Sequence, residues 1–160
     1  TVSQSLPGID GVVIVTTPQE IALLDSRKSI NFAKTISVPV LGVIENMSGY
    51  TIRGTAEANT RVSVMGPSGI PLECETDGEG NWALTLDVFK SGGGEASAND
   101  LDVPFLGSLP FDPGIVRGGD DGVHRIVSEP DGETAQAFDS IVARITEELE
   151  GGSGPSLRIT

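Results

Sequence analysis

The chain has 160 residues, of which 23 are acidic and 10 are basic, giving a formal net charge of −13 at pH 7. Such an acidic surface repels phosphate backbones and anionic membranes, which argues against nucleic acid and membranes as partners. The single cysteine, Cys74, excludes an internal disulfide and a four-cysteine metal site within one chain.

The first ten residues, TVSQSLPGID, lack the basic and apolar regions of a signal peptide. No apolar run in the sequence approaches the ~20 residues that a membrane helix needs. We therefore expect a cytoplasmic protein.

Three short apolar runs predict strands that are buried on both faces: GVVIVT at 11–16, VPVLGVI at 38–44 and VPFLGSL at 103–109. Continuous apolar runs of this kind are typical of a parallel sheet. Between the first two runs, Thr17 can cap a helix and Pro18 suits its first position. A strand, a helix and a second strand within about 35 residues predict a βαβ unit.

Residues 51–86 follow a different pattern. The stretches RVSVM at 61–65, IPLECE at 70–75 and WALTL at 82–86 alternate apolar with other residues, and glycine-containing turns separate them. This pattern predicts a three-stranded antiparallel meander. We expect it to form a small β insert, residues 51–87.

The last predicted element is an amphipathic helix with one apolar stripe. The stripe consists of Phe138, Ile141, Val142, Ile145 and Leu149. We expect the glycine-rich residues 151–160 beyond it to be a flexible tail. The predicted fold is therefore α/β, with a parallel sheet between two helical layers, formed by residues 1–50 and 88–150 around the insert.

Residues that follow the strands are the candidate site, because open α/β sheets bind ligands beyond the carboxyl ends of their strands. Asn46 and Met47 follow the second run, and Pro110, Phe111 and Asp112 follow the third. An asparagine amide can pair with the edge of an adenine ring, and a proline-rich turn can pack against its face. From spacing alone, the simpler interpretation is that Asn46 tolerates a turn and Pro110 ends a strand.

A glycine-rich stretch, SGGGEASAND at 91–100, precedes a predicted short helix. Glycines before a helix N-terminus can hold an anion. No Lys-Ser or Lys-Thr pair follows, which favours a simple flexible hinge.

Four segments in this order resemble the Mrp/Nbp35 (ApbC-like) family of iron–sulfur cluster carrier ATPases. They are DGVVIVTTPQEIALLDSRKSINF, VPVLGVIENMSGY, FKSGGG and VPFLGSLPFDPGIVRGGDDG. The resemblance implies a MinD-like P-loop fold, ATP bound between two subunits, and delivery of iron–sulfur clusters to apo client proteins. It also implies that Asn46 reads the adenine and that the turn from Pro110 to Asp112 lines the base pocket.

Two departures from the family pattern limit what the chain can do. The sequence contains no GxxxxGK[ST] phosphate loop and no Walker B aspartate, and without them phosphoryl transfer loses its electrostatic stabilisation. We therefore expect the distal half of the family's domain, inactive alone and dependent on an N-terminal P-loop half or a second subunit.

The second departure concerns the family's CPxC pair, whose place after ENMS is taken by the β insert. Cys74 is the only thiol, and two copies of the chain would give two ligands, whereas a cluster usually takes four. A bound cluster is therefore doubtful, and Cys74 is a weak candidate ligand. We expect His124 to be a surface or packing residue.

The insert itself resembles the start of bacterial Ig-like repeats, in GTAEANTRVSVMGPSG and DGEGNW. Its length is far below the ~100 residues of a complete sandwich. The insert suggests one alternative function, a non-catalytic protein- or carbohydrate-binding module on an α/β scaffold. A second alternative is a fragment of a MinD/ParA-like partition ATPase, because the same fold serves different functions. Without a P-loop half, the strand at 11–16 is an edge strand whose unpaired groups favour a homodimer or another partner.

Overall fold

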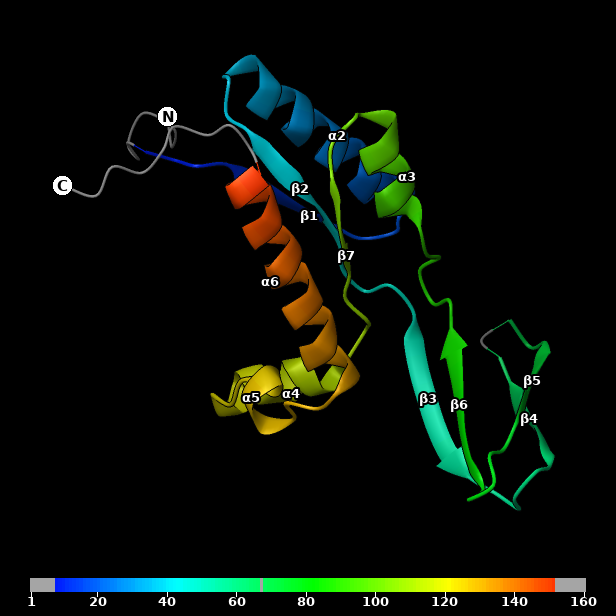
Figure 1. Cartoon of the computed structure of the whole chain (residues 1–160). Helices are drawn as coiled ribbons and strands as arrows, with labels where there is room; N and C mark the ends of the chain where they lie inside the picture. The colour runs from blue at the N-terminus through cyan, green and yellow to red at the C-terminus, as the bar shows by residue number, and fades with distance from the viewer. Residues whose placement is uncertain (1–7, 67, 152–160) are drawn as a thin grey trace.

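The computed structural model describes residues 8–66 and 68–151. Most of the tail expected at 151–160 lies outside the described residues, and Gly151 is the last residue of a helix. Figure 1 shows an α/β body with a β segment extending from one end.

A three-stranded sheet forms the centre of the body. Strands β1 (Val12–Thr16), β2 (Val40–Glu45) and β7 (Phe105–Ser108) pair in the order β1-β2-β7, and both pairings are parallel. The three predicted strands and the parallel sheet are confirmed. β1 is an edge strand of this sheet.

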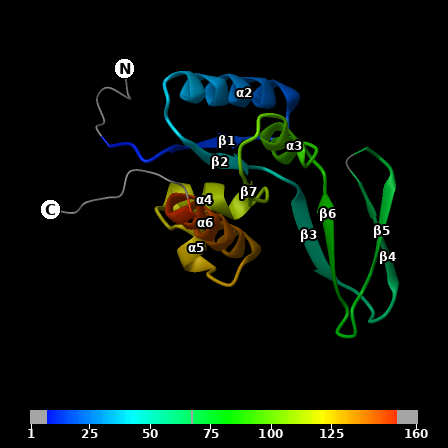
Figure 2. The same ribbon diagram turned by 45° about the horizontal axis from the view of Figure 1, so that its top comes forward.

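Helices cover both faces of the sheet, as the sequence predicts. Helices α2 (Glu20–Thr35) and α3 (Gly93–Asp100) lie on one face, and α6 (Glu133–Gly151) lies on the other (Figure 2). Because neighbouring strand residues point to opposite faces, Val43 packs with Ile30 on the first side. Ile44 packs with Ile141 on the second side.

The start of α2 differs from the prediction. The N-cap is Gln19, which makes no side-chain capping bond, so the prediction that Thr17 caps the helix is wrong. The hydroxyl of Thr17 is buried and finds no hydrogen-bond partner among the described residues.

Helix α6 buries a narrower stripe than expected. Ile141 is buried, and Phe138 and Ile145 pack beside it. Val142 and Leu149 are exposed, because a sheet of three strands covers only a narrow band of the helix.

The β segment, residues 50–86, contains four strands in two separate sheets. β3 (Tyr50–Thr55) pairs with β6 (Asn81–Leu86), and β4 (Arg61–Met65) pairs with β5 (Pro71–Glu75), both antiparallel. Figure 1 shows them side by side, away from the body.

The three-stranded meander is therefore wrong in its connectivity, because β6 pairs with β3 instead of β5. The link from β5 to β6 is a tight turn held by Asp77. Its carboxylate accepts from the backbone N–H groups of Glu79 and Asn81, at 2.9 and 2.8 Å. The next strand is thereby directed to β3.

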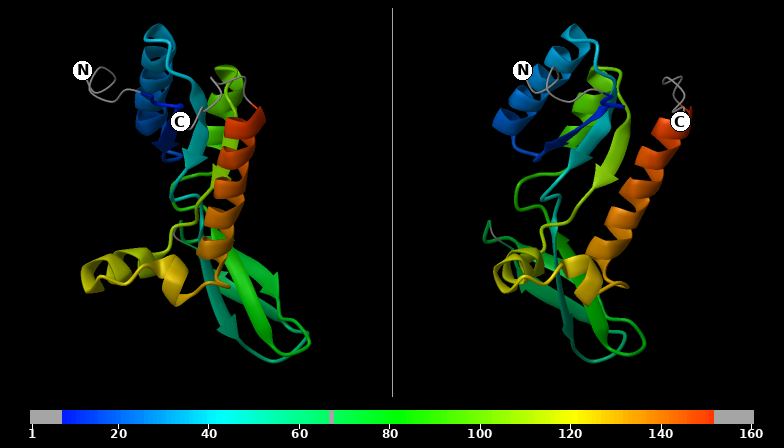
Figure 3. Two further views of the ribbon diagram at one scale, coloured as in Figure 1. Left: turned by 60° about the vertical axis from the view of Figure 1, so that its left-hand side comes forward. Right: turned by 90° about the vertical axis from the view of Figure 1, so that its left-hand side faces the viewer.

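Two short helices, α4 (Pro113–Asp121) and α5 (Arg125–Ser128), precede α6. Figure 3 shows them projecting sideways from the start of α6. None of the helices in the described part of the chain has the length and apolar character to cross a membrane.

Candidate functional site

The loops that follow the three parallel strands meet at the carboxyl edge of the sheet. The Asn46 backbone N–H donates to the carbonyl of Thr16 at 2.7 Å, joining the ends of β1 and β2. The Leu109 N–H donates to the carbonyl of Glu45 at 2.8 Å, joining β2 to the end of β7. The candidate residues therefore start from one continuous hydrogen-bonded edge.

The loops after β2 and β7 stay together beyond this edge. The Ser48 N–H donates to the carbonyl of Leu109 at 3.0 Å, and the Phe111 N–H donates to the carbonyl of Gly49 at 2.8 Å. The chain segments that carry Asn46 and Phe111 are thus neighbours, as the sequence predicts.

The turn that carries Asn46 has an unusual backbone. Met47 has φ 61° and Gly49 has φ 77°, and left-handed φ is uncommon for a residue such as methionine. Asn46 supports the turn through its Oδ1, which accepts from the Met47 N–H at 2.9 Å. Among the described residues, none accepts a hydrogen bond from Asn46 Nδ2.

A carboxylate lies beneath this turn. The side chain of Glu45 is 0% exposed. Its Oε1 accepts from the Ser48 hydroxyl at 2.7 Å and from the Gly92 N–H at 3.0 Å, and its Oε2 accepts from the Gly94 N–H at 2.6 Å. The glycine loop before α3 therefore does hold an anion, and that anion is Glu45.

Glu45 directly follows the apolar run at 38–44, and it is absent from the site residues that the sequence predicts. One signal in the sequence pointed to it, because an acidic residue that continues a buried apolar run must find donors inside the protein. Gly94 is required for this contact: a Cβ at Gly94 would lie 2.9 Å from the Cβ of Glu45.

Asp112 is committed to internal hydrogen bonds. It is the N-cap of α4, where Oδ1 accepts from the Gly114 N–H at 2.7 Å. Its Oδ2 accepts from Arg125 Nε at 2.8 Å and from the Thr134 hydroxyl at 2.7 Å. Burial raises the pKa of Asp112, but the bonds from Arg125, Thr134 and Gly114 together outweigh burial and lower the pKa.

An aromatic cluster joins the β7 loop to both ends of the β segment. The ring of Phe111 meets Tyr50, at the start of β3, edge to face with ring centroids 5.7 Å apart. Phe89, which follows β6, meets Phe111 at 6.1 Å. Such pairs are favourable beyond the area that they bury, so Phe111 anchors the base of the β segment.

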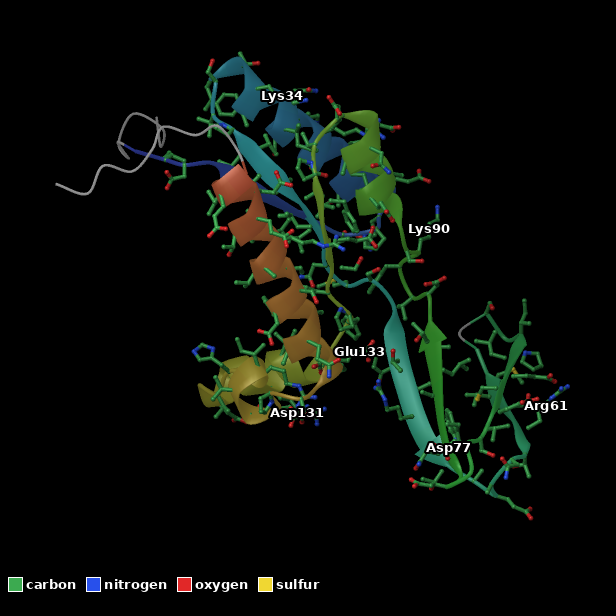
Figure 4. All side chains as sticks on the ribbon, viewed as in Figure 1. Lys34, Arg61, Asp77, Lys90, Asp131 and Glu133 are labelled. Atoms are coloured by element: carbon green, nitrogen blue, oxygen red, sulfur yellow. The ribbon has the colours of Figure 1, made fainter. Side chains whose placement is uncertain are left out.

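The predicted site residues line two different cavities. Pro110, Phe111 and Asp112 line a cavity of about 500 Å³ between β3 and the start of α6. Glu133, labelled in Figure 4, also lines this cavity, and it pairs with Arg53 of β3 at 2.8 Å.

Asn46 lines a second cavity, of about 340 Å³, with Thr16, Thr17 and Ser26 at the edge of β1. Met47 is partly exposed and lines neither of these two cavities. The main chains of the predicted residues are therefore brought together, while their side chains face two spaces.

The remaining candidates are isolated. Cys74 lies half-buried in β5, and His124 is an exposed residue before α5. Within residues 8–66 and 68–151, no group of three or more His, Cys, Asp or Glu side chains is placed to hold a metal ion.

Comparison with known proteins identifies relatives over most of the chain. The ParA family model, described as NUBPL iron-transfer P-loop NTPase, matches residues 1–77 and 79–146, which include most of the β segment. The iron-sulfur cluster carrier protein of Methanocaldococcus jannaschii is 36% identical over 151 residues, covering 94% of this chain and 42% of the relative. That of Synechocystis is 37% identical over 145 residues, covering 91% and 33%.

Solved structures show the same fold. The cell division ATPase MinD of Pyrococcus furiosus superposes with a TM-score of 0.55 at 19% identity, covering 86% of this chain and 43% of MinD. MinD of Pyrococcus horikoshii, complexed with Mg-ADP, gives 0.55 at 21% identity, covering 89% and 43%. The chain thus spans less than half the length of the relatives that it matches.

Proposed function

The chain belongs to the ParA family of iron-transfer P-loop NTPases, and we propose that it supplies the base-binding edge of an ATP-binding iron–sulfur cluster carrier. The observation that carries this proposal is the hydrogen-bonded edge where the loops after β2 and β7 run together. In open α/β sheets, nucleotides bind beyond this end of the strands. Asn46, Met47, Pro110, Phe111 and Asp112 are the proposed contributors.

Asn46 and Pro110 would recognise the base in different ways. The Nδ2 group of Asn46 can donate to a ring nitrogen acceptor of adenine. Because Asn46 and Pro110 line separate cavities, a base that contacts both must lie over the two loops between these cavities. Asp112 would act indirectly, by fixing the turn, since both of its oxygens are already bonded.

We propose that the phosphates and Mg²⁺ are held by a P-loop-bearing segment that docks on the open edge of β1. The apolar side chain of Val15, which belongs to this edge strand, is 60% exposed. The buried, unpartnered hydroxyl of Thr17 lines the cavity at the same edge. Such a segment would complete the sheet and give this hydroxyl a partner.

The cluster itself does not fit the residues of this chain. The one thiol, Cys74, lies in β5, and a cluster usually needs four protein ligands. We propose that cluster ligands come from outside these 160 residues. A homodimer, apo iron–sulfur clients and a cytoplasmic location belong to the same proposal.

Calorimetry of Mg-ATP binding tests the proposed function. The isolated chain should bind ATP weakly, with no dependence on Mg²⁺, and an equimolar mixture with a P-loop half from a relative should bind it tightly. Tight Mg²⁺-dependent binding by the isolated chain would contradict the proposal. Failure of the mixture to bind, despite association of the two parts, would contradict it as well.

A binding module is the second candidate, and one observation favours it. A groove of about 620 Å³ crosses the β segment and is lined by Trp82, Arg53, Asn81 and Asp77, a set that combines an aromatic face with polar groups. On this proposal residues 51–87 are a separate insert that captures a partner. Deleting them should abolish partner capture in the second case and leave nucleotide binding intact in the first.

A further inference from the structure

Glu45 contacts both ends of the long chain segment that leaves the sheet after β2 and returns at α3. On the outgoing side its Oε1 accepts from Ser48 at 2.7 Å. On the returning side its two oxygens accept from Gly92 at 3.0 Å and Gly94 at 2.6 Å. Both ends are therefore tied to one buried carboxylate.

The bond between Glu45 and Ser48 spans the turn that contains Asn46 and Met47. Met47 has φ 61°, and a non-glycine residue in this region persists only where its surroundings hold it. Two hydrogen bonds hold this turn. The Ser48 hydroxyl donates to Glu45, and the Met47 N–H donates to Asn46 Oδ1. The direction of the Asn46 amide thus depends on the carboxylate beneath it.

The charge on Glu45 is compensated only by hydrogen-bond donors. A buried carboxylate without enough donors is strongly unfavourable, and the three donors found here are a hydroxyl and two backbone N–H groups. These donors cannot turn to another anion while Glu45 is in place. The Gly92 and Gly94 N–H groups at the start of α3 are consequently not available to a ligand phosphate.

We propose that Glu45 is a positioning residue for base recognition, which holds the Asn46 turn against the glycine loop so that the Asn46 amide meets the base. This inference rests on the proposed nucleotide site. Glu45 touches neither nucleotide nor cluster, and it acts through the backbone of the turn.

The Glu45→Gln variant tests the proposal, because the amide keeps the shape of the side chain but replaces one acceptor oxygen with a donor. ATP and GTP affinities are measured in the mixture with a P-loop half. We expect ATP binding to weaken about tenfold, the cost of one lost buried hydrogen bond, with GTP binding little changed. Glu20→Gln is the matched control, since Glu20 is an exposed carboxylate paired with Lys90.

A double-variant cycle separates positioning from general destabilisation. If Glu45 acts through Asn46, the Glu45→Gln/Asn46→Ala protein binds ATP no more weakly than Asn46→Ala alone. Additive losses, or equal weakening of ATP and GTP, would overturn the proposal. Should Glu45→Gln not fold, Ser48→Ala removes one of the three bonds and is expected to cause a smaller loss of the same selectivity.

A second measurement keeps the two proposals distinct. If the unmodified mixture does not bind ATP, the proposed function fails, and the role of Glu45 is decided by NMR on the chain alone. Glu45→Gln should then shift the side-chain amide signals of Asn46 together with the backbone amides of Gly92 and Gly94. Unchanged Asn46 signals would reject the positioning role.

Discussion

Arg125 donates from Nε to the carboxylate of Asp112 at 2.8 Å, and this contact ties α5 to the N-cap of α4. Both side chains are mostly buried. Arg125 also pairs with Glu129 one turn further along. The contact fixes the turn that follows β7, and with it the proposed base-binding residues Pro110 and Phe111.

Replacing Asp112 by Asn should lower the free energy of unfolding by about 2 kcal/mol, because the hydrogen bonds from Arg125 and Thr134 lose their charged acceptor. Urea denaturation measures the change. Asp25→Asn is the control, since its pair with Lys28 is exposed on both sides and should contribute less than about 0.5 kcal/mol. Equal effects of the two variants would show that Asp112 does not hold the turn.

The pKa of Asp112 is lowered from its ordinary value of 3.8, and this predicts the pH dependence of stability. A lowered pKa means that the ionised form stabilises the fold, so its contribution is present well above the ordinary pKa of 3.8 and is lost as the pH falls through the lowered pKa. Urea midpoints measured from pH 6 to pH 2.5 should fall less steeply for Asp112→Asn than for the unmodified chain. Equal pH dependence of the urea midpoints in the two proteins would contradict the lowered pKa of Asp112.

Gly94→Ala should destabilise the protein, because a Cβ there would lie 3.1 Å from Oε2 of Glu45 and 2.9 Å from its Cβ. Gly119→Ala is a matched control in helix α4, where a Cβ meets nothing within 4 Å. In the control, the free energy of unfolding should rise by about 0.5–1 kcal/mol, because alanine has a higher helix propensity than glycine. Thermal unfolding followed by circular dichroism compares the two, and a tolerated Gly94→Ala would mean that the glycine loop can move away from Glu45.

Gly54→Ala should alter the packing of Trp82, whose indole lies over Gly54 across the β3–β6 pair. A Cβ at Gly54 would lie 2.5 Å from the indole ring. Trp82 is the only tryptophan, so a shift of intrinsic fluorescence towards longer wavelength is the expected result. Gly78→Ala, in an open turn, should leave the emission unchanged.

Val15→Ser should weaken association with a P-loop half at least about tenfold, as expected for loss of a buried valine from an interface. Val127→Ser is the control, because Val127 is also exposed but lies on α5, remote from β1. Analytical ultracentrifugation of the mixtures measures both. Equal weakening by both variants would mean that β1 is not the docking edge.

The sequence predicts the body of the molecule well because the signals there are local. Continuous apolar runs locate β1, β2 and β7, and helical spacing locates α6. The strand β3 escapes this reasoning: its pairing with β6 depends on a contact between Gly54 and Trp82, far apart in the chain. The spacing of apolar residues along the sequence does not indicate a contact between such distant residues.

The candidate site is predictable only in part, for a related reason. Its position after the strands follows from the topology of parallel sheets, so Asn46 and Phe111 are found on adjacent loops. Which side chains form hydrogen bonds with which partners depends on distances in the folded protein, and the sequence pattern does not give these distances. Glu45 meets Gly94, and Asp112 meets Arg125 and Thr134, so these side chains are already engaged in the fold.

Cys74 and Trp82 have a practical consequence, because the only thiol and the only indole of the chain lie on β5 and β6, in the two separate sheets of the β segment. A dye attached to Cys74 that absorbs at the emission wavelength of Trp82 would accept energy from Trp82. The transfer efficiency would report the distance between these two residues. Movement of the β4–β5 sheet relative to the β3–β6 sheet can then be timed in a stopped-flow instrument without introducing a mutation.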